Sequence, residues 1–359
     1  MADDTGNDSL PPMATLNRMT APKNRGPQPR FKPATFLIAI VIAALLIYAV
    51  KPNQLDVYKG FDELQFEDPA LAQCVKESAA ANNWREVGDA LKLRCNNPSG
   101  SGIESLVGIE HLVELTEINL SFNRISNLEP LVPLARLEIL DLSHNRIAWV
   151  PVFRSAPALR RIELNYNQIE SLDWLTDEHF LALKSLSIGH NHVTDITKIR
   201  ALDGISELSI RDNRIVNLEP AWELQDLVML DAGKNLIEDI SGIGALGKLR
   251  RLFLDRNKIV SLDGIEVLHD LEELDLSYNS LESTTAIASL ERMQRLNLTQ
   301  TGLTDLDDIL SLGDLDLLRI PGNPDLACAD ITVAMKEYGE SVIRTDRSCS
   351  AINDELSKN

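Results

Sequence analysis

Aromatic and histidine side chains recur at a fixed spacing in the first half of the chain, and these residue types are suited to binding. Phe122, His144, Tyr166 and His190 follow one another at steps of 22, 22 and 24 residues. Aromatic rings with a polar tip are common anchors in interfaces. In a stacked repeat, neighbours would lie about 4.8 Å apart. We therefore predict a ligand-binding stripe at these four positions, although ordinary solvated positions on a repeat would give the same pattern.

A second group combines bases with an aromatic residue in a strongly acidic chain. It consists of Lys234, Arg251, Phe253 and Arg256, whereas the whole chain has 35 Lys and Arg against 54 Asp and Glu. We predict that this group contacts the same protein or peptide ligand. The net charge of −19 and the pI near 4.7 argue against a nucleic-acid partner.

Catalysis and metal binding are both poorly supported. His144 and His190 would lie two repeats, or about 10 Å, apart, too far to share one ion through bonds of about 2 Å. The sequence contains no P-loop, HExxH, CxxC or nucleophile-elbow motif. We expect no metal, no cofactor and no catalysis, and a cryptic enzyme of the cell envelope is the least favoured alternative.

One asparagine follows each member of the aromatic stripe, and the series continues far beyond it. The step is 22 residues except for one of 24, and a threonine takes the ninth place. A strict period of this length indicates a repeat array. The members of this asparagine ladder are Asn123, Asn145, Asn167, Asn191, Asn213, Asn235, Asn257, Asn279, Thr301 and Asn323.

Each repeat combines a short strand with a turn. Leu274 and Leu276 alternate with Glu273 and Asp275, so the leucines should face inward. We expect Asn279 to point inward and to satisfy backbone groups of the turn. Threonine lacks the amide, so the turn at position 301 should be weaker. A repeat of 22 residues leaves little room for a full helix, and no repeat can bury its leucines without neighbours and end caps.

This pattern resembles the leucine-rich repeat family, in particular the 22-residue class of the internalins and of the leucine-rich regulators of protein phosphatase. The resemblance covers roughly residues 103–326 and implies an α/β repeat solenoid of about ten repeats. It further implies a horseshoe whose parallel sheet lines a concave, ligand-binding face. The departures are two extra residues around Thr176–Phe180, Ala232 in place of a strand leucine, and Thr301. In the first repeat the resemblance rests on Leu115, Ile118, Leu120, Asn123, Ile125 and Leu128.

Two cysteine pairs bracket the array, Cys74 with Cys95 and Cys328 with Cys349. Their placement predicts two disulfides in an oxidising compartment, and four free thiols in a cytosolic protein are the alternative.

Each pair falls in a segment that reads as a helical cap. Asp68-Pro69 is a helix start, followed by a helix over Ala70–Ala81 and a strand over Leu91–Leu93. Near the C-terminus we expect a helix over about Ala329–Tyr338, a stop at Gly339, and a strand that ends near Cys349. This end looks like the cysteine-bearing cap of exported leucine-rich repeat proteins.

An uncharged apolar run over Ala34–Val50 predicts a membrane anchor. A helix of this length spans about 25 Å, at the short end for a bilayer. Bases precede the run, so the positive-inside rule places the N-terminus in the cytoplasm. A cleaved signal peptide is the alternative, although the region before the run is long. The bases are Arg18, Lys23, Arg25, Arg30 and Lys32.

The predicted organisation follows the chain from a disordered cytoplasmic tail to a second short tail. We expect a single-pass protein of the inner (cell) membrane whose periplasmic or extracellular repeats bind a protein or peptide. A structural spacer without a discrete ligand and an envelope polymer as ligand remain alternatives. The segments are a tail over 1–33, a transmembrane helix over 34–50, a linker over 51–66, an N-terminal cap over 67–102, repeats over 103–326, a C-terminal cap over 327–351 and a tail over 352–359.

Overall fold

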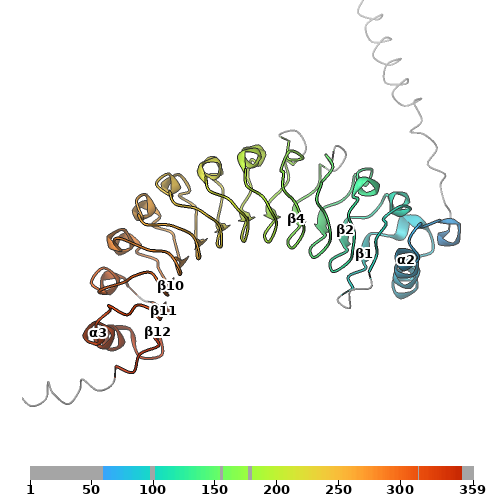
Figure 1. Cartoon of the computed structure of the whole chain (residues 1–359). Coiled ribbons are helices and arrows are strands. Elements are labelled where there is room, and N and C mark those ends of the chain that lie inside the picture. The colour runs from blue at the N-terminus through green and yellow to red at the C-terminus, as the bar shows by residue number, and fades with distance from the viewer. Residues whose placement is uncertain (1–59, 98–101, 154–156, 177–179, 314, 350–359) are drawn as a thin grey trace, which may run out of the picture. The chain divides into compact units, whose positions relative to one another are not determined.

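A computed structural model describes residues 60–97, 102–153, 157–176, 180–313 and 315–349. The predicted tails at 1–33 and 352–359, the membrane segment at 34–50 and most of the linker at 51–66 lie outside these residues. Within the described ranges, no helix is both long enough and apolar enough to cross a membrane. The repeats stack side by side along an arc, with the strands on its inner side (Figure 1).

Each repeat adds one short parallel strand to a single sheet. Across most steps a residue pairs with the residue 22 positions later, as Leu274 does with Leu296. The predicted parallel concave sheet is therefore confirmed. In the described part of the chain the strands run in sequence order: β1 Lys92–Arg94, β2 Glu117–Asn119, β3 Ile139–Asp141, β4 Arg161–Glu163, β5 Ser185–Ser187, β6 Glu207–Ser209, β7 Met229–Asp231, β8 Arg251–Phe253, β9 Glu273–Asp275, β10 Arg295–Asn297, β11 Leu317–Arg319 and β12 Ile343–Arg344.

The outer side of the arc carries 3-10 helices of three to five residues. A 3-10 helix has about 3.0 residues per turn and rises about 2.0 Å per residue. One turn therefore needs only about three residues, which fits where a full α-helix would not. Pro130 and Pro220 stand in first-turn positions, where a missing amide hydrogen is harmless. The outer helices are η3 Ile109–His111, η4 Glu129–Leu131, η5 Thr197–Ala201, η6 Glu219–Glu223, η7 Ile243–Ala245, η8 Ile265–Val267, η9 Thr285–Ser289 and η10 Ile309–Ser311, while η1 Phe61–Glu63 and η2 Val87–Asp89 precede the repeats.

The core is a set of leucine and isoleucine columns that runs through all repeats. Leu274 and Leu276 are both buried, as their alternation with acids predicts. Each such side chain contributes about 1.5–3 kcal/mol through burial. The longer repeat fills its extra volume with Trp174 and Phe180, whose rings meet edge to face at 5.5 Å.

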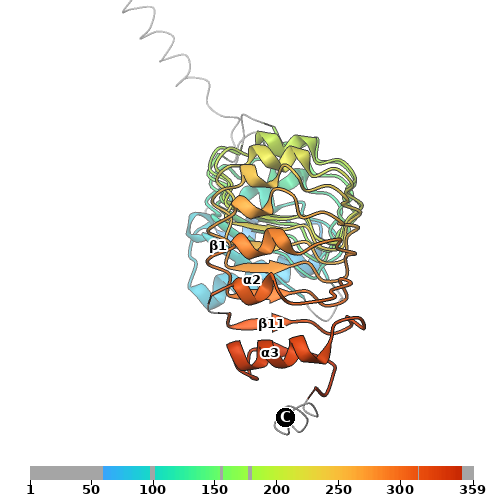
Figure 2. The same cartoon turned by 90° about the vertical axis from the view of Figure 1, so that its left-hand side faces the viewer.

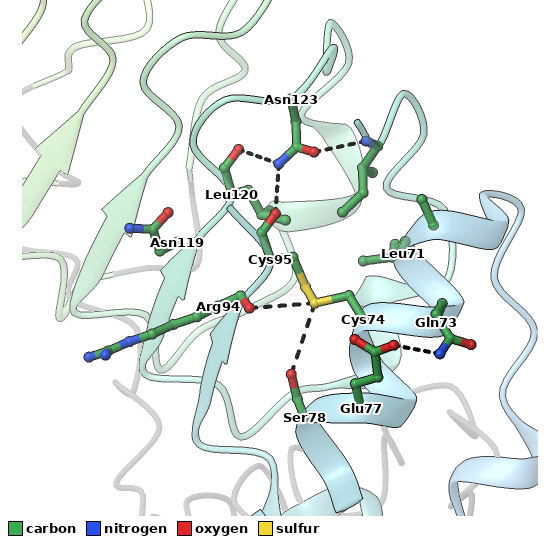
Figure 3. Close-up of a disulfide and its surroundings, with 12 residues drawn as sticks. Leu71, Gln73, Cys74, Glu77, Ser78, Arg94, Cys95, Asn119, Leu120 and Asn123 are labelled. Atoms are coloured by element: carbon green, nitrogen blue, oxygen red, sulfur yellow. Dashed lines mark hydrogen bonds between the residues drawn. A yellow bond between two sulfur atoms is a disulfide. The ribbon is translucent and has the colours of Figure 1, made fainter. Parts of the chain in front are cut away.

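The predicted N-terminal cap forms, although its strand covers Lys92–Arg94 instead of Leu91–Leu93. Helix α2, Pro69–Asn82, begins at Asp68, whose carboxylate accepts a hydrogen bond from the Ala70 amide at 2.7 Å. Cys74 on α2 is joined to Cys95 after β1, with the Cα atoms 5.8 Å apart. Figure 3 shows this disulfide beside the first rung of the ladder, where the Asn123 amide donates to the Cys95 carbonyl at 2.8 Å.

The C-terminal cap is formed by α3, Cys328–Tyr338, and Figure 2 shows this helix beyond β11 as the last layer. Gly339 ends the helix, and the Cys328–Cys349 disulfide forms as predicted. The expectation of a strand ending near Cys349 was wrong, because β12 ends at Arg344. Beyond it the chain turns back, since Arg347 binds the carbonyls of Leu326 and Pro324.

Candidate functional site

The asparagine ladder determines where the candidate site residues lie. Asn145 donates from Nδ2 to the Leu142 carbonyl in its own turn at 2.9 Å and to the Leu120 carbonyl in the preceding repeat at 3.0 Å. Its Oδ1 accepts from the Ile125 amide, again in the preceding repeat, at 2.9 Å. The prediction that the asparagine satisfies its turn is confirmed. The structure adds that each amide also joins two repeats.

Thr301 keeps only part of this bonding. Its hydroxyl donates to the Leu298 carbonyl at 2.9 Å. With an asparagine at this position, the Leu281 amide would donate its hydrogen bond to the side-chain oxygen. It donates instead to the backbone carbonyl of Thr301 at 3.0 Å. A recess of about 210 Å³, lined in part by Thr284 and Asp308, adjoins this turn.

The residue before each rung has a left-handed backbone. We call this series the turn column: Phe122, His144, Tyr166, His190, Asp212, Lys234, Arg256, Tyr278, Gln300 and Gly322. In its non-glycine members φ lies between 52° and 60°. This conformation is unfavourable by about 1–2 kcal/mol for a residue with a Cβ. The ladder bonds on the following residue hold the turn in it.

The structure brings the four residues of the predicted aromatic stripe into one stack. Ring centroids are 4.1 Å apart from Phe122 to His144, 4.1 Å from His144 to Tyr166, and 3.8 Å from Tyr166 to His190. The interplanar angles are 11°, 10° and 9°. The rings are therefore nearly parallel and form a continuous column across four repeats.

Stacking covers the faces of the inner rings and leaves their edges outward. His144 and Tyr166 each have a ring on both sides, yet Tyr166 is 45% exposed. Phe122, at the start of the stack, is 42% exposed. The edge of an aromatic ring is electropositive and its face electronegative. The stripe thus presents ring edges, imidazole nitrogens and a hydroxyl.

Polar contacts continue the turn column past the rings. His190 Nδ1 lies 2.8 Å from Asp212 Oδ2, and Lys234 Nζ lies 3.3 Å from the same oxygen. Further on, the Arg256 guanidinium lies 3.9 Å from the centroid of the Tyr278 ring, a cation–π contact.

His144 is set apart electrostatically from an ordinary surface histidine. Burial between its neighbours lowers its pKa, the charge of Asp141 offsets part of this effect, and the charge of His190 adds to it. A lowered pKa favours the neutral imidazole near pH 7. In that form the ring offers one hydrogen-bond donor and one acceptor.

The bases of the predicted basic and aromatic group each contact a different neighbour in the structure. Lys234 is paired with Asp212, and Arg256 covers Tyr278. Arg251 stands at the opposite end of β8, where Nη2 lies 3.7 Å from Glu207 Oε1. Phe253 is half-buried at the end of β8. Each base therefore has a contact of its own, and the binding role of the group remains a prediction.

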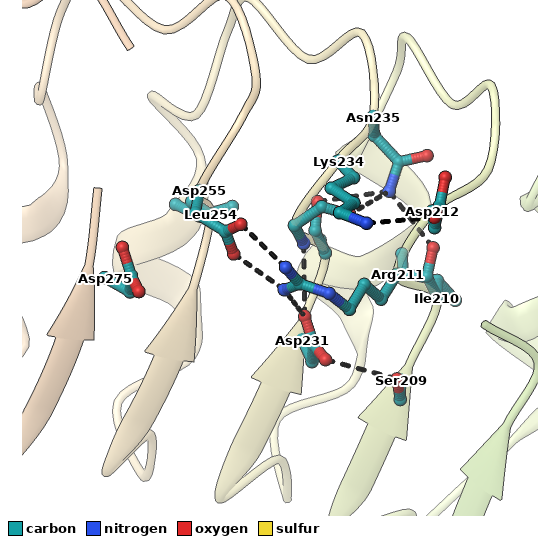
Figure 4. A network of polar contacts seen from close by, with 12 residues as sticks. Ser209, Ile210, Arg211, Asp212, Asp231, Lys234, Asn235, Leu254, Asp255 and Asp275 are labelled. Atoms are coloured by element: carbon teal, nitrogen blue, oxygen red, sulfur yellow. Dashed lines mark hydrogen bonds and ion pairs between the residues drawn. The ribbon is translucent and has the colours of Figure 1, made fainter. Parts of the chain in front are cut away.

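An ion-pair network at Arg211 was missed by the sequence reasoning. Its guanidinium pairs with Asp255 at 2.6 and 2.7 Å and with Asp231 at 3.2 Å, so it connects three repeats (Figure 4). A Cβ on Gly233 would lie 2.3 Å from both Arg211 Nη1 and Asp255 Oδ1. Burial raises the pKa of Asp231, although Arg211 opposes the shift. The sequence signal that could have indicated this network is the spacing of Arg211, Gly233 and Asp255 at steps of 22 residues.

Comparisons with known proteins agree with this geometry. A Leucine Rich Repeat family model matches residues 270–293. An internalin, InlF, of Listeria monocytogenes superposes with a TM-score of 0.63 over 82% of this chain and 99% of its own, at 20% identity. The chain folds as a leucine-rich repeat solenoid.

Two further structures share this leucine-rich repeat fold. The functional domain of InlJ from Listeria monocytogenes gives a TM-score of 0.62 at 24% identity, over 75% of this chain and 60% of its own. A leucine-rich repeat protein of Leptospira interrogans gives 0.59 at 24% identity, over 73% and 74%. A search of curated proteins found no match. These likenesses support the leucine-rich repeat fold of the solenoid.

The histidines and carboxylates of the described residues were candidates for a metal site or a catalytic group. Among the described residues, no group of three or more His, Cys, Asp or Glu side chains is placed to hold a metal ion. The His190–Asp212 contact has no nucleophile beside it in the turn column, because its next member is Lys234, which binds Asp212.

Proposed function

We propose that this leucine-rich repeat protein binds a protein or peptide partner through its concave face and has no catalysis of its own. The observation that carries the proposal is the stack of Phe122, His144, Tyr166 and His190 along one edge of the concave sheet. The stack is preformed, so a partner would lose little of its binding free energy to ordering these rings.

A polymer of sugars is a weaker candidate for this surface. Sugar rings pack on open aromatic faces, and the faces of His144 and Tyr166 are covered by their neighbours in the stack. A polypeptide can instead use the exposed edges, with the Tyr166 hydroxyl and the histidine nitrogens bonding to main-chain groups. A spacer role without a discrete ligand is the competing class.

The proposal includes an uncleaved signal anchor at residues 34–50, with the repeats in the periplasm or outside the cell. The apolar run and the bases that precede it support this topology. The two disulfides support an oxidising compartment. We assign the repeats to the 22-residue class, on the 22-residue register between most neighbouring strands.

Photocrosslinking in living cells would test the binding role. A photoreactive residue at Tyr166 should give one dominant adduct. The same residue at Val267, which is 49% exposed in η8 on the outer side of the arc, is the matched control and should not give that adduct. Many weak adducts from both positions would favour the spacer, and turnover of an envelope substrate would favour an enzyme.

A second experiment tests the topology independently of any ligand. Alkaline phosphatase fused after Asn359 is active only when it is exported, so the full chain should give activity. Deletion of residues 34–50 should abolish the activity. A fusion that stays inactive in the full chain, while a cytoplasmic reporter at the same place is active, would overturn the proposed orientation.

A further inference from the structure

The two exposed columns on either side of the ladder are almost free of acids. One is the turn column. The other, the rim column, follows each rung and comprises Arg124, Arg146, Gln168, His192, Arg214, Leu236, Lys258, Ser280, Gly302 and Pro324. Together they hold six Lys and Arg and one acid, Asp212, in a chain with 54 Asp and Glu. This edge of the sheet is therefore a basic strip on an acidic protein.

Several of these bases have no carboxylate partner. Within the described ranges Arg146, Arg214 and Arg256 form no ion pair, and the Arg256 guanidinium lies over the Tyr278 ring. Arg124 and Lys258 pair with Glu104 and Glu238 at 3.3 Å, but all four side chains are well exposed. Exposed ion pairs of this kind contribute little to stability, so the carboxylates of a partner can compete for these bases.

The aromatic stack, like the unpaired bases, favours a negatively charged ligand. Its members show their electropositive edges, because their faces lie against one another. Tyr166 adds a hydroxyl that can donate a hydrogen bond. Arg124 and Arg146 each lie two residues beyond a stacked ring. A hydrogen-bond acceptor that carries negative charge therefore suits both columns.

We propose that the partner is an acidic polypeptide segment, bound lengthwise along this strip with its carboxylates toward Arg146 and Arg214. This inference rests on the proposed function and names the class of ligand. From Phe122 to Tyr278 the strip is about 34 Å long at 4.8 Å per repeat, which an extended segment of about ten residues would span. Exposed Phe122 and Tyr166 leave room for apolar side chains between the carboxylates.

A highly charged polymer fits this strip less well than a peptide. Binding of polyanions relies on neutralising many phosphates at once. Only three bases of the two columns lack a carboxylate partner in the described structure, and the chain as a whole carries −19. A few carboxylates match three bases, whereas a long run of phosphates would be repelled by the remaining surface.

The test selects random twelve-residue peptides on the full chain in detergent and then measures binding of the best peptide by fluorescence anisotropy. Selected peptides should be enriched in Asp and Glu, and replacing those residues by Asn and Gln should weaken binding. The Arg146→Gln, Arg214→Gln double variant should weaken binding by at least about tenfold, since each charge-assisted hydrogen bond is strong.

A matched control removes the same charge elsewhere. Lys76 on α2 and Lys336 on α3 are exposed and form no ion pair within the described residues. The Lys76→Gln, Lys336→Gln variant should bind as the wild type does, and both double variants should keep the wild-type Tm. Equal weakening in the two variants would show a nonspecific effect of net charge and would overturn the assignment.

Other outcomes separate this inference from the proposed function. Neutral or basic peptides whose binding is lost on Tyr166→Asn but unchanged in the Arg146→Gln, Arg214→Gln variant would overturn the acidic partner and leave the concave-face proposal standing. Tighter binding of polyphosphate than of any selected peptide would overturn it in favour of a polyanion. Failure to select any peptide, together with no dominant crosslink at Tyr166, would refute both.

Discussion

At the scale of single residues, the buried amide of the ladder and the exposed residue before it depend on each other. The turn column needs a positive φ, which is unfavourable for Phe122, His144 and Tyr166. The ladder amide compensates by bonding to backbone groups of two repeats. This coupling lets bulky aromatic residues occupy a backbone conformation where Gly or Asn would ordinarily be found.

Replacing a ladder residue should therefore lower the stability of the fold. Asn145→Ala leaves the buried Ile125 amide without its side-chain acceptor, whereas the Leu120 carbonyl keeps its bond from Asn123. An unsatisfied buried group costs about 1–3 kcal/mol, so we expect a loss of roughly 2 kcal/mol in the free energy of unfolding. Chemical denaturation measures it. Asn145→Thr, which copies Thr301, is the control and should lose less; equal losses would contradict the bonding pattern.

The lowered pKa of His144 predicts a pH dependence of stability. A histidine that loses its proton more readily when folded contributes stability that is fully present above the unfolded value of 6.5. That contribution is lost as pH falls through the lowered folded pKa. His144→Phe keeps a stacked ring and does not titrate. Its free energy of unfolding should therefore fall less than that of the wild type between pH 7 and pH 5.

Urea denaturation at several pH values would check this expectation for His144. The control is His269→Phe, which makes the same replacement of imidazole by phenyl at an exposed position outside the concave columns. A wild-type and a His144→Phe profile that run parallel over this interval would show that burial in the stack does not disfavour the imidazolium.

At the scale of elements, contacts that span several strands lock neighbouring repeats together. Arg211, two residues beyond β6, passes over Gly233 to reach Asp255 beyond β8. A bidentate arginine–carboxylate pair has a fixed geometry, so it constrains the relative position of three repeats. The concave sheet is stiffened at this point, close to the centre of the array.

Gly233→Ala tests this constraint. The added Cβ would lie 2.3 Å from the guanidinium and from the Asp255 carboxylate, so the ion pair must shift. Overpacking of this kind typically costs about 1–3 kcal/mol. Gly247→Ala, where the added Cβ meets nothing within 4 Å, should be near neutral. Thermal unfolding of the two variants gives the comparison, and equal effects would argue against the network.

The caps should depend on their disulfides. Each disulfide closes a loop of 21 residues, which corresponds to about 3 kcal/mol in the chain-entropy model. The Cys328→Ser, Cys349→Ser double variant should lower the unfolding free energy by roughly that amount. Hydrogen exchange should increase first in α3. Unchanged protection of α3 would show that its packing alone holds the cap.

At the scale of the whole molecule, the array behaves as a line of nearest-neighbour interfaces. Most interfaces contain a complete asparagine rung, whereas the Thr301 hydroxyl bonds to the Leu298 carbonyl in its own repeat and the Leu281 amide of the preceding repeat binds the Thr301 backbone. Stability should therefore be unevenly distributed along the solenoid. The weak interface separates the last two repeats and the C-terminal cap from the repeats before them.

Thr301→Asn should repair this interface. The new amide can donate to the Leu276 and Leu298 carbonyls, as other rungs do, for a gain of about 1 kcal/mol. Hydrogen exchange in residues 301–349 should slow relative to that in residues 123–279. The control is Thr304→Asn, an exposed position three residues further on, which should leave the exchange unchanged. Faster exchange in Thr301→Asn would mean that the turn cannot accommodate the amide.

Much of this architecture was predictable because it is repeated. The alternation around Leu274, the period of the asparagines and the paired cysteines each predict a local feature, and a solenoid is a sum of such features. The position of every residue of the turn column followed from its place before a rung. The end of β12 did not follow, because Arg347 turns the chain back through contacts with residues more than twenty positions earlier.

The sequence by itself determined which side chains share a column, because a 22-residue period returns each of them to the same place on the next strand. Only the tertiary structure decided how the members of a column meet. Ring faces close on one another from Phe122 to His190, Arg251 turns to Glu207, and Arg211 reaches across Gly233. Such contacts depend on the rotamers and the left-handed turns that neighbouring repeats impose on each other, which no period in the sequence specifies.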